Sequence, residues 1–119
     1  MRYFGSSGIR GVYGEKITAE LGMALGAALG NTNSPIVVGY DHRKTSPLLS
    51  FALSSGAMSV GSNILELGLV PTPTVAYWAR HARMGVMVTA SHNPPEYNGF
   101  KLWNPDGLSY VTHLSLIHI

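Results

Sequence analysis

A serine stands where an apolar run gives way to a stiff loop, in the stretch TASHNPPEYNGFKLW at residues 89–103. Ser91 follows the run MGVMVTA and precedes His92, and Pro94 and Pro95 restrict the loop that comes next. Open α/β sheets bind ligands at the carboxyl ends of their strands, so the Ser91 hydroxyl would lie at a ligand-binding edge. The stretch is equally compatible with a serine that only caps an ordinary loop.

A serine hydrolase is the first chemistry to consider, and the local sequence disfavours it. The nucleophile elbow has the pattern G-x-S-x-G, whereas Thr89 and Asn93 occupy the two glycine positions here. His92 is adjacent to Ser91, and neighbouring side chains tend to point apart. The other candidate histidines have no visible carboxylate to orient them, so acyl hydrolysis is the weakest interpretation.

The stretch FGSSGIRG at residues 4–11 could bind an anion. Its three glycines expose backbone N–H groups, and Ser6, Ser7 and Arg10 add donors that suit a phosphate. It is neither a Walker loop nor a dinucleotide-binding fingerprint. A plain glycine-rich turn between two strands explains it equally well.

Two further segments carry charged groups. Asn98-Gly99 predicts a tight turn that returns Lys101 toward the serine. The segment GYDHRKTSP at residues 39–47 ends a predicted strand, and its Asp41 could orient a nearby cation. For that second segment, with its Arg43 and Lys44, an ordinary polar loop is the preferred interpretation. The histidines lack the helical spacing of a metal pair, so no metal site made wholly by this chain is expected.

Predicted strands and helices alternate along the chain. Short apolar runs at residues 35–41, 62–70 and 84–90 predict buried strands, and capped patterns at residues 18–30, 46–61 and 72–83 predict helices. Thr18 and Ser46 are the expected N-caps of the first two helices. The glycines spaced by four in the first helix (Gly22, Gly26 and Gly30) predict close packing of that helix on the sheet. The pattern predicts an α/β fold: a three-layer αβα domain with a mostly parallel sheet and helices on both faces.

The composition excludes several classes of protein. The chain has 119 residues, which suffices for one domain, and it has no cysteine, so disulfides and thiolate chemistry are excluded. Net charge is +2 without a basic stripe, and no apolar run is long enough for a signal peptide or a membrane span. We therefore expect a cytoplasmic protein that binds neither nucleic acid nor membrane. Charged residues make up only 12%, against about 25% in typical proteins, which suggests that something else covers part of the surface.

Three stretches in order, FGSSGIRG, VVGYDHR and TASHNPPEYNGFKLWNPDG, resemble the N-terminal domain of the α-D-phosphohexomutases. This superfamily includes phosphoglucomutase, phosphomannomutase and phosphoglucosamine mutase. The resemblance covers residues 2 to about 108, and the TASHNP-type stretch is the most specific part. It implies four catalytic residues, Ser91, Arg10, Lys101 and His92, and three that bind substrate or phosphate, Ser7, Gly8 and Asn93.

The resemblance also implies a reaction. The phosphorylated Ser91 would give its phosphoryl group to a hexose 1-phosphate, and the bisphosphate intermediate would turn over and return the other phosphate. Arg10 and Lys101 suit the charge of such a transition state. Mg²⁺, bound in part through the Ser91 phosphate, and an activator of the glucose 1,6-bisphosphate type are the implied cofactors.

The sequence departs from the family at its C-terminal end. The family binds Mg²⁺ through a D-x-D-x-D loop in a second domain, and this chain has no such loop. We therefore expect an incomplete first domain at residues 1–108 and a truncated or non-native tail at 109–119. Such a fragment would be inactive alone, its partners being a hexose phosphate and the missing C-terminal domains. The alternative from another class is a phosphate- or sugar-phosphate-binding module without turnover.

Overall fold

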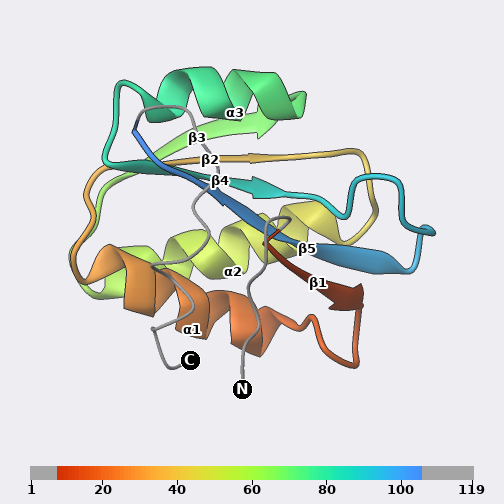
Figure 1. Ribbon diagram of the computed structural model, residues 1–119. Helices are drawn as coiled ribbons and strands as arrows, with labels where there is room; N and C mark the ends of the chain where they lie inside the picture. Colours follow the sequence, from red (N-terminus) through yellow and green to blue (C-terminus); the bar gives the residue numbers. More distant parts are fainter. Residues whose placement is uncertain (1–7, 106–119) are drawn as a thin grey trace.

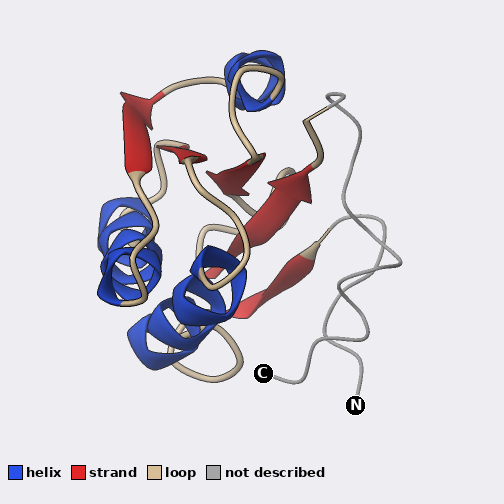
Figure 2. Ribbon diagram, turned by 90° about the vertical axis from the view of Figure 1, so that its left-hand side faces the viewer, coloured by secondary structure: helices blue, strands red, loops and turns tan. Residues whose placement is uncertain are grey.

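The computed structural model describes residues 8–105, which form a five-stranded sheet between two layers of helices (Figure 1). Helices α1 and α2 cover one face of the sheet, and α3 covers the other (Figures 1 and 2). The elements in chain order are β1 (Ile9–Val12), α1 (Ala19–Gly30), β2 (Ile36–Tyr40), α2 (Ser46–Ser59), β3 (Ile64–Leu69), α3 (Thr72–Ala79), β4 (Met84–Val88) and β5 (Tyr97–Trp103). The predicted three-layer α/β fold with helices on both faces is confirmed. The expected tail at 109–119 and Ser7 lie outside the described residues.

The sheet is mixed, so the expectation of a mostly parallel sheet was imprecise. Its strand order is β1-β5-β4-β2-β3, in which β2 pairs parallel with β3 and β4, while β5 pairs antiparallel with β4 and β1. Parallel strands require a crossover connection, which α2 and α3 provide. No helix separates β4 from β5, so the chain turns back through a loop and β5 runs antiparallel.

The helix caps were predicted in part. Thr18 caps α1 as expected, because its Oγ1 accepts a hydrogen bond of 3.0 Å from the N–H of Leu21. The prediction of Ser46 as a cap was wrong, since α2 begins at Ser46 and Thr45 is its N-cap residue. The Ser46 hydroxyl instead donates to Asp41 Oδ1 at 2.6 Å, which removes it from capping.

Most of the core lies between the sheet and the α1–α2 layer. Its fully buried members include Leu25, Leu53, Val86, Phe100 and Leu102. Only two of the three strands predicted as buried are so. The strand β3 is an edge strand, with exposed leucines along it, because β2 pairs with it on one side and the described chain has no strand on the other.

The expected packing of the α1 glycines on the sheet holds only for Gly22, where a Cβ would press on Phe100 of β5 as well as on α2. The other two glycines lie against α2 alone. A Cβ at Gly26 would overlap the carbonyl oxygen of Leu53 in α2, and a Cβ at Gly56 would overlap the carbonyl oxygen of Met23 in α1. The two helix backbones are therefore in direct contact. None of the described helices has the length and hydropathy needed to cross a bilayer.

Gly26→Ala is expected to destabilise the fold by about 1–3 kcal/mol, the usual cost of overpacking. In an unconstrained helix the same change stabilises by about 1 kcal/mol. The sign of the change in the free energy of unfolding therefore distinguishes the two cases. Urea unfolding of the two proteins measures it, and Ala24→Gly at an exposed position of α1 gives the ordinary propensity cost. A stabilising Gly26→Ala would contradict the observed helix contact.

Candidate functional site

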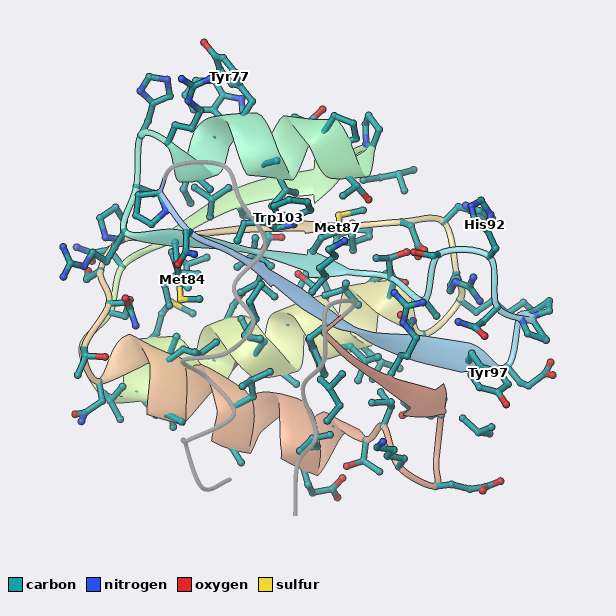
Figure 3. The ribbon with its side chains drawn as sticks, viewed as in Figure 1. Tyr77, Met84, Met87, His92, Tyr97 and Trp103 are labelled. Carbon is teal, nitrogen blue, oxygen red and sulfur yellow. The ribbon has the colours of Figure 1, made fainter. Side chains whose placement is uncertain are left out.

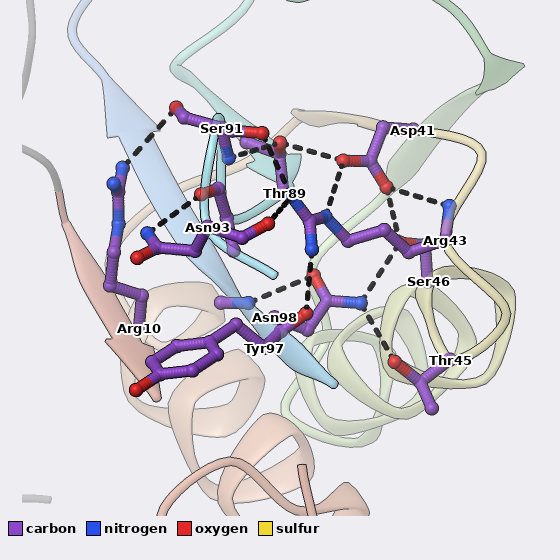
Figure 4. A network of polar contacts seen from close by, with 12 residues as sticks. Arg10, Asp41, Arg43, Thr45, Ser46, Thr89, Ser91, Asn93, Tyr97 and Asn98 are labelled. Atoms are coloured by element: carbon purple, nitrogen blue, oxygen red, sulfur yellow. Dashed lines mark hydrogen bonds and ion pairs between the residues drawn. The ribbon is translucent and has the colours of Figure 1, made fainter. Parts of the chain in front are cut away.

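Ser91 lies just beyond β4, at the carboxyl edge of the parallel strands, and its side chain is exposed. Its φ of 55° is the left-handed value that non-glycine residues rarely adopt, and among the described residues no other non-glycine residue has a positive φ. The Ser91 N–H donates to Thr89 Oγ1 at 3.0 Å (Figure 4). A sterically unfavourable backbone thus presents the hydroxyl at the carboxyl edge of the sheet.

Arg10 reaches Ser91 from a strand 81 residues earlier. It lies on β1 opposite Gly99 of β5, where a Cβ would press on the Arg10 main chain, so the glycine permits this close strand pairing. The Arg10 Nη2 then donates to Ser91 Oγ at 3.4 Å, a long contact at the exposed rim (Figure 4). The structure therefore brings together two of the predicted catalytic residues.

Arg43 holds the loop that carries Ser91, which we call the Ser91 loop (residues 89–97). Only 8% of the Arg43 side chain is exposed. Its guanidinium donates to four main-chain carbonyl oxygens of the loop, those of Ser91 (2.8 Å), Asn93 (2.8 Å), Pro94 (2.7 Å) and Tyr97 (3.1 Å). The interpretation of this segment as an ordinary polar loop was wrong for Arg43.

Asp41 joins Arg43 to the other side of the loop. Its carboxylate accepts hydrogen bonds from the hydroxyls of Ser46 (2.6 Å) and Thr89 (2.7 Å) and pairs with Arg43 Nε at 3.3 Å. Burial alone would raise the pKa of Asp41, but these hydrogen bonds, the backbone N–H of Arg43 and the Arg43 charge together hold that pKa below its usual value. Asp41 is therefore an ionised carboxylate at neutral pH, and the cation it orients is Arg43.

Asn98 is a buried polar residue that the sequence placed in a turn. It lies instead within β5, where Asn98 and Gly99 pair with β1. Its Nδ2 donates to the hydroxyls of Thr45 (2.8 Å) and Ser46 (3.0 Å), and its Oδ1 accepts from the N–H of Gly99. The start of α2 is thereby tied to β5, directly beneath the Ser91 loop (Figure 4).

Two predicted residues share the Ser91 loop. His92 is exposed directly after Ser91, and its side chain points outward from the loop (Figure 3). The Asn93 side chain turns inward, because its Nδ2 donates to the carbonyl oxygen of Ala90 at 2.9 Å. Asn93 therefore shapes the loop, while the His92 ring is open to a ligand.

The other two described candidates lie on or against β5. Lys101 pairs with Met87, and its Nζ is 4.8 Å from the centre of the Trp103 ring, which turns the ammonium along the strand away from Ser91. Gly8 has a φ of 80° and lies so close to β5 that a Cβ would overlap the carbonyl oxygen of Phe100. In this structure Lys101 and Gly8 thus border the site without contacting the Ser91 hydroxyl.

The edge beside the site is hollowed. A cavity of about 320 Å³ lies between the carboxyl ends of β2 and β3 and the start of α3, and Asp41, His42 and Met87 are part of its lining. Within residues 8–105 no three His, Asp or Glu side chains come together in a way that could hold a metal ion.

Comparison with known proteins decides the family. Residues 1–115 match the family described as phosphoglucomutase/phosphomannomutase, alpha/beta/alpha domain I. The chain belongs to this phosphoglucomutase/phosphomannomutase family. The sequence resemblance to the phosphohexomutases is thereby confirmed.

Relatives in the family are much longer than this chain. Proteins named "Probable phosphoglucosamine mutase" from Methanocella arvoryzae and Methanothermobacter thermautotrophicus are 51% and 53% identical, over 92% of this chain and 25% of their own length. A solved structure of a phosphoglucomutase/phosphomannomutase family protein from Burkholderia thailandensis superposes with a TM-score of 0.80 at 33% identity, covering 93% of this chain and 27% of that one. A crystal structure described as "putative phosphomannomutase" from Thermus thermophilus gives a TM-score of 0.86 at 32% identity, covering 96% of this chain and 28% of that one. The chain thus spans about a quarter of the length of these family members.

The left-handed backbone at Ser91 leads to a prediction on stability. Ser91→Gly should be more stable than Ser91→Ala by about 1 kcal/mol, because both lose the hydroxyl but only glycine adopts a positive φ without strain. Chemical denaturation of both variants measures the difference. The same pair at exposed Ser55 in the middle of α2 should give the opposite order, since glycine weakens a helix. Equal stabilities at position 91 would contradict the strained loop.

Proposed function

We propose that this chain is the phosphoserine-bearing N-terminal domain of a phosphohexomutase, an enzyme that interconverts hexose 1-phosphates and 6-phosphates through a bisphosphate. The observation that carries the proposal is the Ser91 hydroxyl, presented at the carboxyl edge by a left-handed residue and contacted by the Arg10 guanidinium at 3.4 Å. A hydroxyl beside a fixed cation suits a phosphoryl group better than an acyl group.

The chemistry assigned to Ser91 is a balanced transfer. With phosphoserine 91, the bond from phosphorus to Ser91 Oγ breaks and a bond from phosphorus to a hexose hydroxyl oxygen forms. The hexose hydroxyl gives its proton to a base, and Ser91 Oγ takes up a proton. The resulting bisphosphate reorients in the site, and its other phosphoryl group is transferred to Ser91. In this transfer a bond from phosphorus to Ser91 Oγ forms as the hydroxyl loses its proton, and the bond from phosphorus to the sugar oxygen breaks as that oxygen takes up a proton. The product is the isomeric hexose monophosphate, and the enzyme is again phosphorylated.

The side chains around Ser91 have distinct roles in this scheme. Arg10 would neutralise charge on the transferred group, since its guanidinium already contacts the acceptor oxygen. His92 is exposed next to Ser91 and is our candidate for the residue that contacts the substrate or carries the transferred proton. Lys101 has its ammonium over Trp103 and would have to swing along the strand toward Ser91 to take part.

The site fits Mg²⁺ in one respect. Because the Ser91 hydroxyl is exposed, a phosphate on it could offer an oxygen to a metal ion at the rim. Asp41 is not a candidate ligand, since its oxygens accept from Arg43, Ser46 and Thr89. Mg²⁺, when bound, would supply counter-charge to the phosphoryl group, and the family resemblance assigns its carboxylate ligands to a loop of another domain.

The hydrolase alternative has less support. Within the described residues the Ser91 Oγ contacts a guanidinium, and a cation cannot take a proton from the hydroxyl as a histidine would. A binding module without turnover remains the alternative to be tested directly.

The test is a chimera in which residues 1–110 of this chain replace the matched quarter of the M. arvoryzae relative. With Mg²⁺ and glucose 1,6-bisphosphate, it should interconvert the 1- and 6-phosphates of glucosamine or of another hexose. The intact relative is the control for assembly and activity. A folded chimera that binds hexose phosphates but neither turns over nor takes up phosphate would support the binding module instead.

A further inference from the structure

We propose that Arg43 is a positioning residue for phosphoryl transfer, which acts through the main chain of the Ser91 loop and touches neither the phosphoryl group nor the sugar. Its catalytic consequence rests on the proposed function, whereas its effect on the loop does not. The Arg43 guanidinium is directed at carbonyl oxygens of the loop, and only 8% of the side chain is exposed, so it is not presented to a phosphate group in solvent.

The first argument is the convergence of carbonyls. Four carbonyl oxygens of the Ser91 loop point at one guanidinium, at 2.7 to 3.1 Å. Without a cation between them, these partial negative charges would repel one another and the loop would open. Arginine suits this position because its planar group offers five donors in a fixed fork, whereas a lysine ammonium offers three from one point.

The second argument is that both peptide groups flanking the Ser91 side chain are tied to the same ion pair. The Ser91 carbonyl oxygen accepts from Arg43 Nη2 at 2.8 Å. The Ser91 N–H donates to Thr89 Oγ1, whose hydroxyl donates to Asp41, and Asp41 pairs with Arg43. A closed ring of hydrogen bonds therefore fixes the backbone on either side of the hydroxyl, at a φ of 55° that serine does not favour alone.

The third argument concerns direction. Arg10 lies on β1, while Arg43 and Ser91 follow β2 and β4, so the 3.4 Å contact between Arg10 and Ser91 depends on how the loop is held. If the loop relaxed to an ordinary negative φ, the hydroxyl would leave that position. Small displacements of a reacting group can cost about 10²-fold in rate.

The loop effect is tested on the chain itself with Arg43→Lys, which keeps the charge and loses the fork. Amide hydrogen exchange should become at least about tenfold faster at Ser91, Asn93 and Tyr97, whose N–H groups bond within the loop, and remain unchanged in β2 and β4. Arg80→Lys, an exposed arginine at the end of α3, is the matched control and should change neither region. Unchanged loop exchange, or faster exchange throughout the sheet, would overturn the proposal.

The catalytic consequence is tested in the chimera. Arg43→Lys should lower kcat by about 10²-fold with KM within about twofold, because the substrate contacts remain while the acceptor is misplaced. Phosphate should still map to Ser91 in this variant. An unchanged kcat with a loosened loop would overturn the positioning role, whereas absence of any phosphate on Ser91 in the parent chimera would overturn the proposed function and leave the exchange result standing.

Discussion

Ser91→Ala in the chimera is expected to abolish mutase turnover, with a loss of about 10⁴-fold or more, as when an enzyme loses its nucleophile. The change removes the acceptor oxygen, so the covalent route has no intermediate to pass through. The fold should persist, because the side chain is exposed and a surface substitution typically costs within about 0.5 kcal/mol. Steady-state conversion of hexose 1-phosphate, with thermal unfolding of the same sample, measures both effects.

Ser55→Ala is the matched control for that variant. Ser55 is an exposed serine of α2, on the opposite side of the sheet from α3, and its loss should leave turnover unchanged. A Ser91→Ala chimera that retains more than a few per cent of the activity would show that the phosphoryl group travels by another route.

Arg10→Ala is expected to slow phosphoryl transfer by about 10²–10³-fold, the usual loss for one stabilising donor. Arg10 is the cation that contacts the Ser91 hydroxyl in the described chain at 3.4 Å, so its removal leaves charge on the transferred group without a partner there. Arg10→Lys should recover only part of the rate, because an ammonium offers a point charge instead of a planar fork. Single-turnover transfer from the phosphorylated chimera to hexose phosphate isolates this step.

The control for Arg10 is Arg83→Ala, an exposed arginine just before β4 at the opposite end of that strand from Ser91. It should transfer at the parental rate. If Arg10→Ala transferred within about threefold of the parent, the contact seen here would have no catalytic role.

The order of strands and helices could be predicted from short-range patterns. β-Branched runs marked β2 and β4, and Thr18 marked the start of α1, because each of these signals depends on neighbouring residues. The antiparallel direction of β5 was missed, since Asn98-Gly99 has the sequence of a turn and its burial in a strand is decided by α2 and β1.

The network beneath Ser91 could not be predicted in the same way. Arg43 and its carbonyl partners lie 48 to 54 residues apart, and they meet only because β2 and β4 are neighbours in the sheet. In sequence, Arg43 follows a strand among other polar residues, which is typical of an exposed loop. The sequence pattern correctly places Ser91 at the carboxyl edge of the parallel strands. The backbone conformation that presents its hydroxyl depends on residues that are distant in the sequence.

The direction of the Lys101 side chain was also predicted wrongly from the sequence pattern. Its position after Gly99 predicted a return toward Ser91, yet β5 continues in extended form and carries the ammonium toward Trp103. Strand geometry explains this, because Lys101 pairs with Met87 and not with the residues of the loop.

The central claim is that Ser91 carries the exchangeable phosphoryl group. Phosphosite mapping by mass spectrometry, after the chimera is incubated with glucose 1,6-bisphosphate and Mg²⁺, tests it most directly. We predict phosphate on Ser91, lost when a hexose monophosphate acceptor is added in excess. Phosphate on Ser6, Ser7 or Ser46 with none on Ser91 would contradict the account.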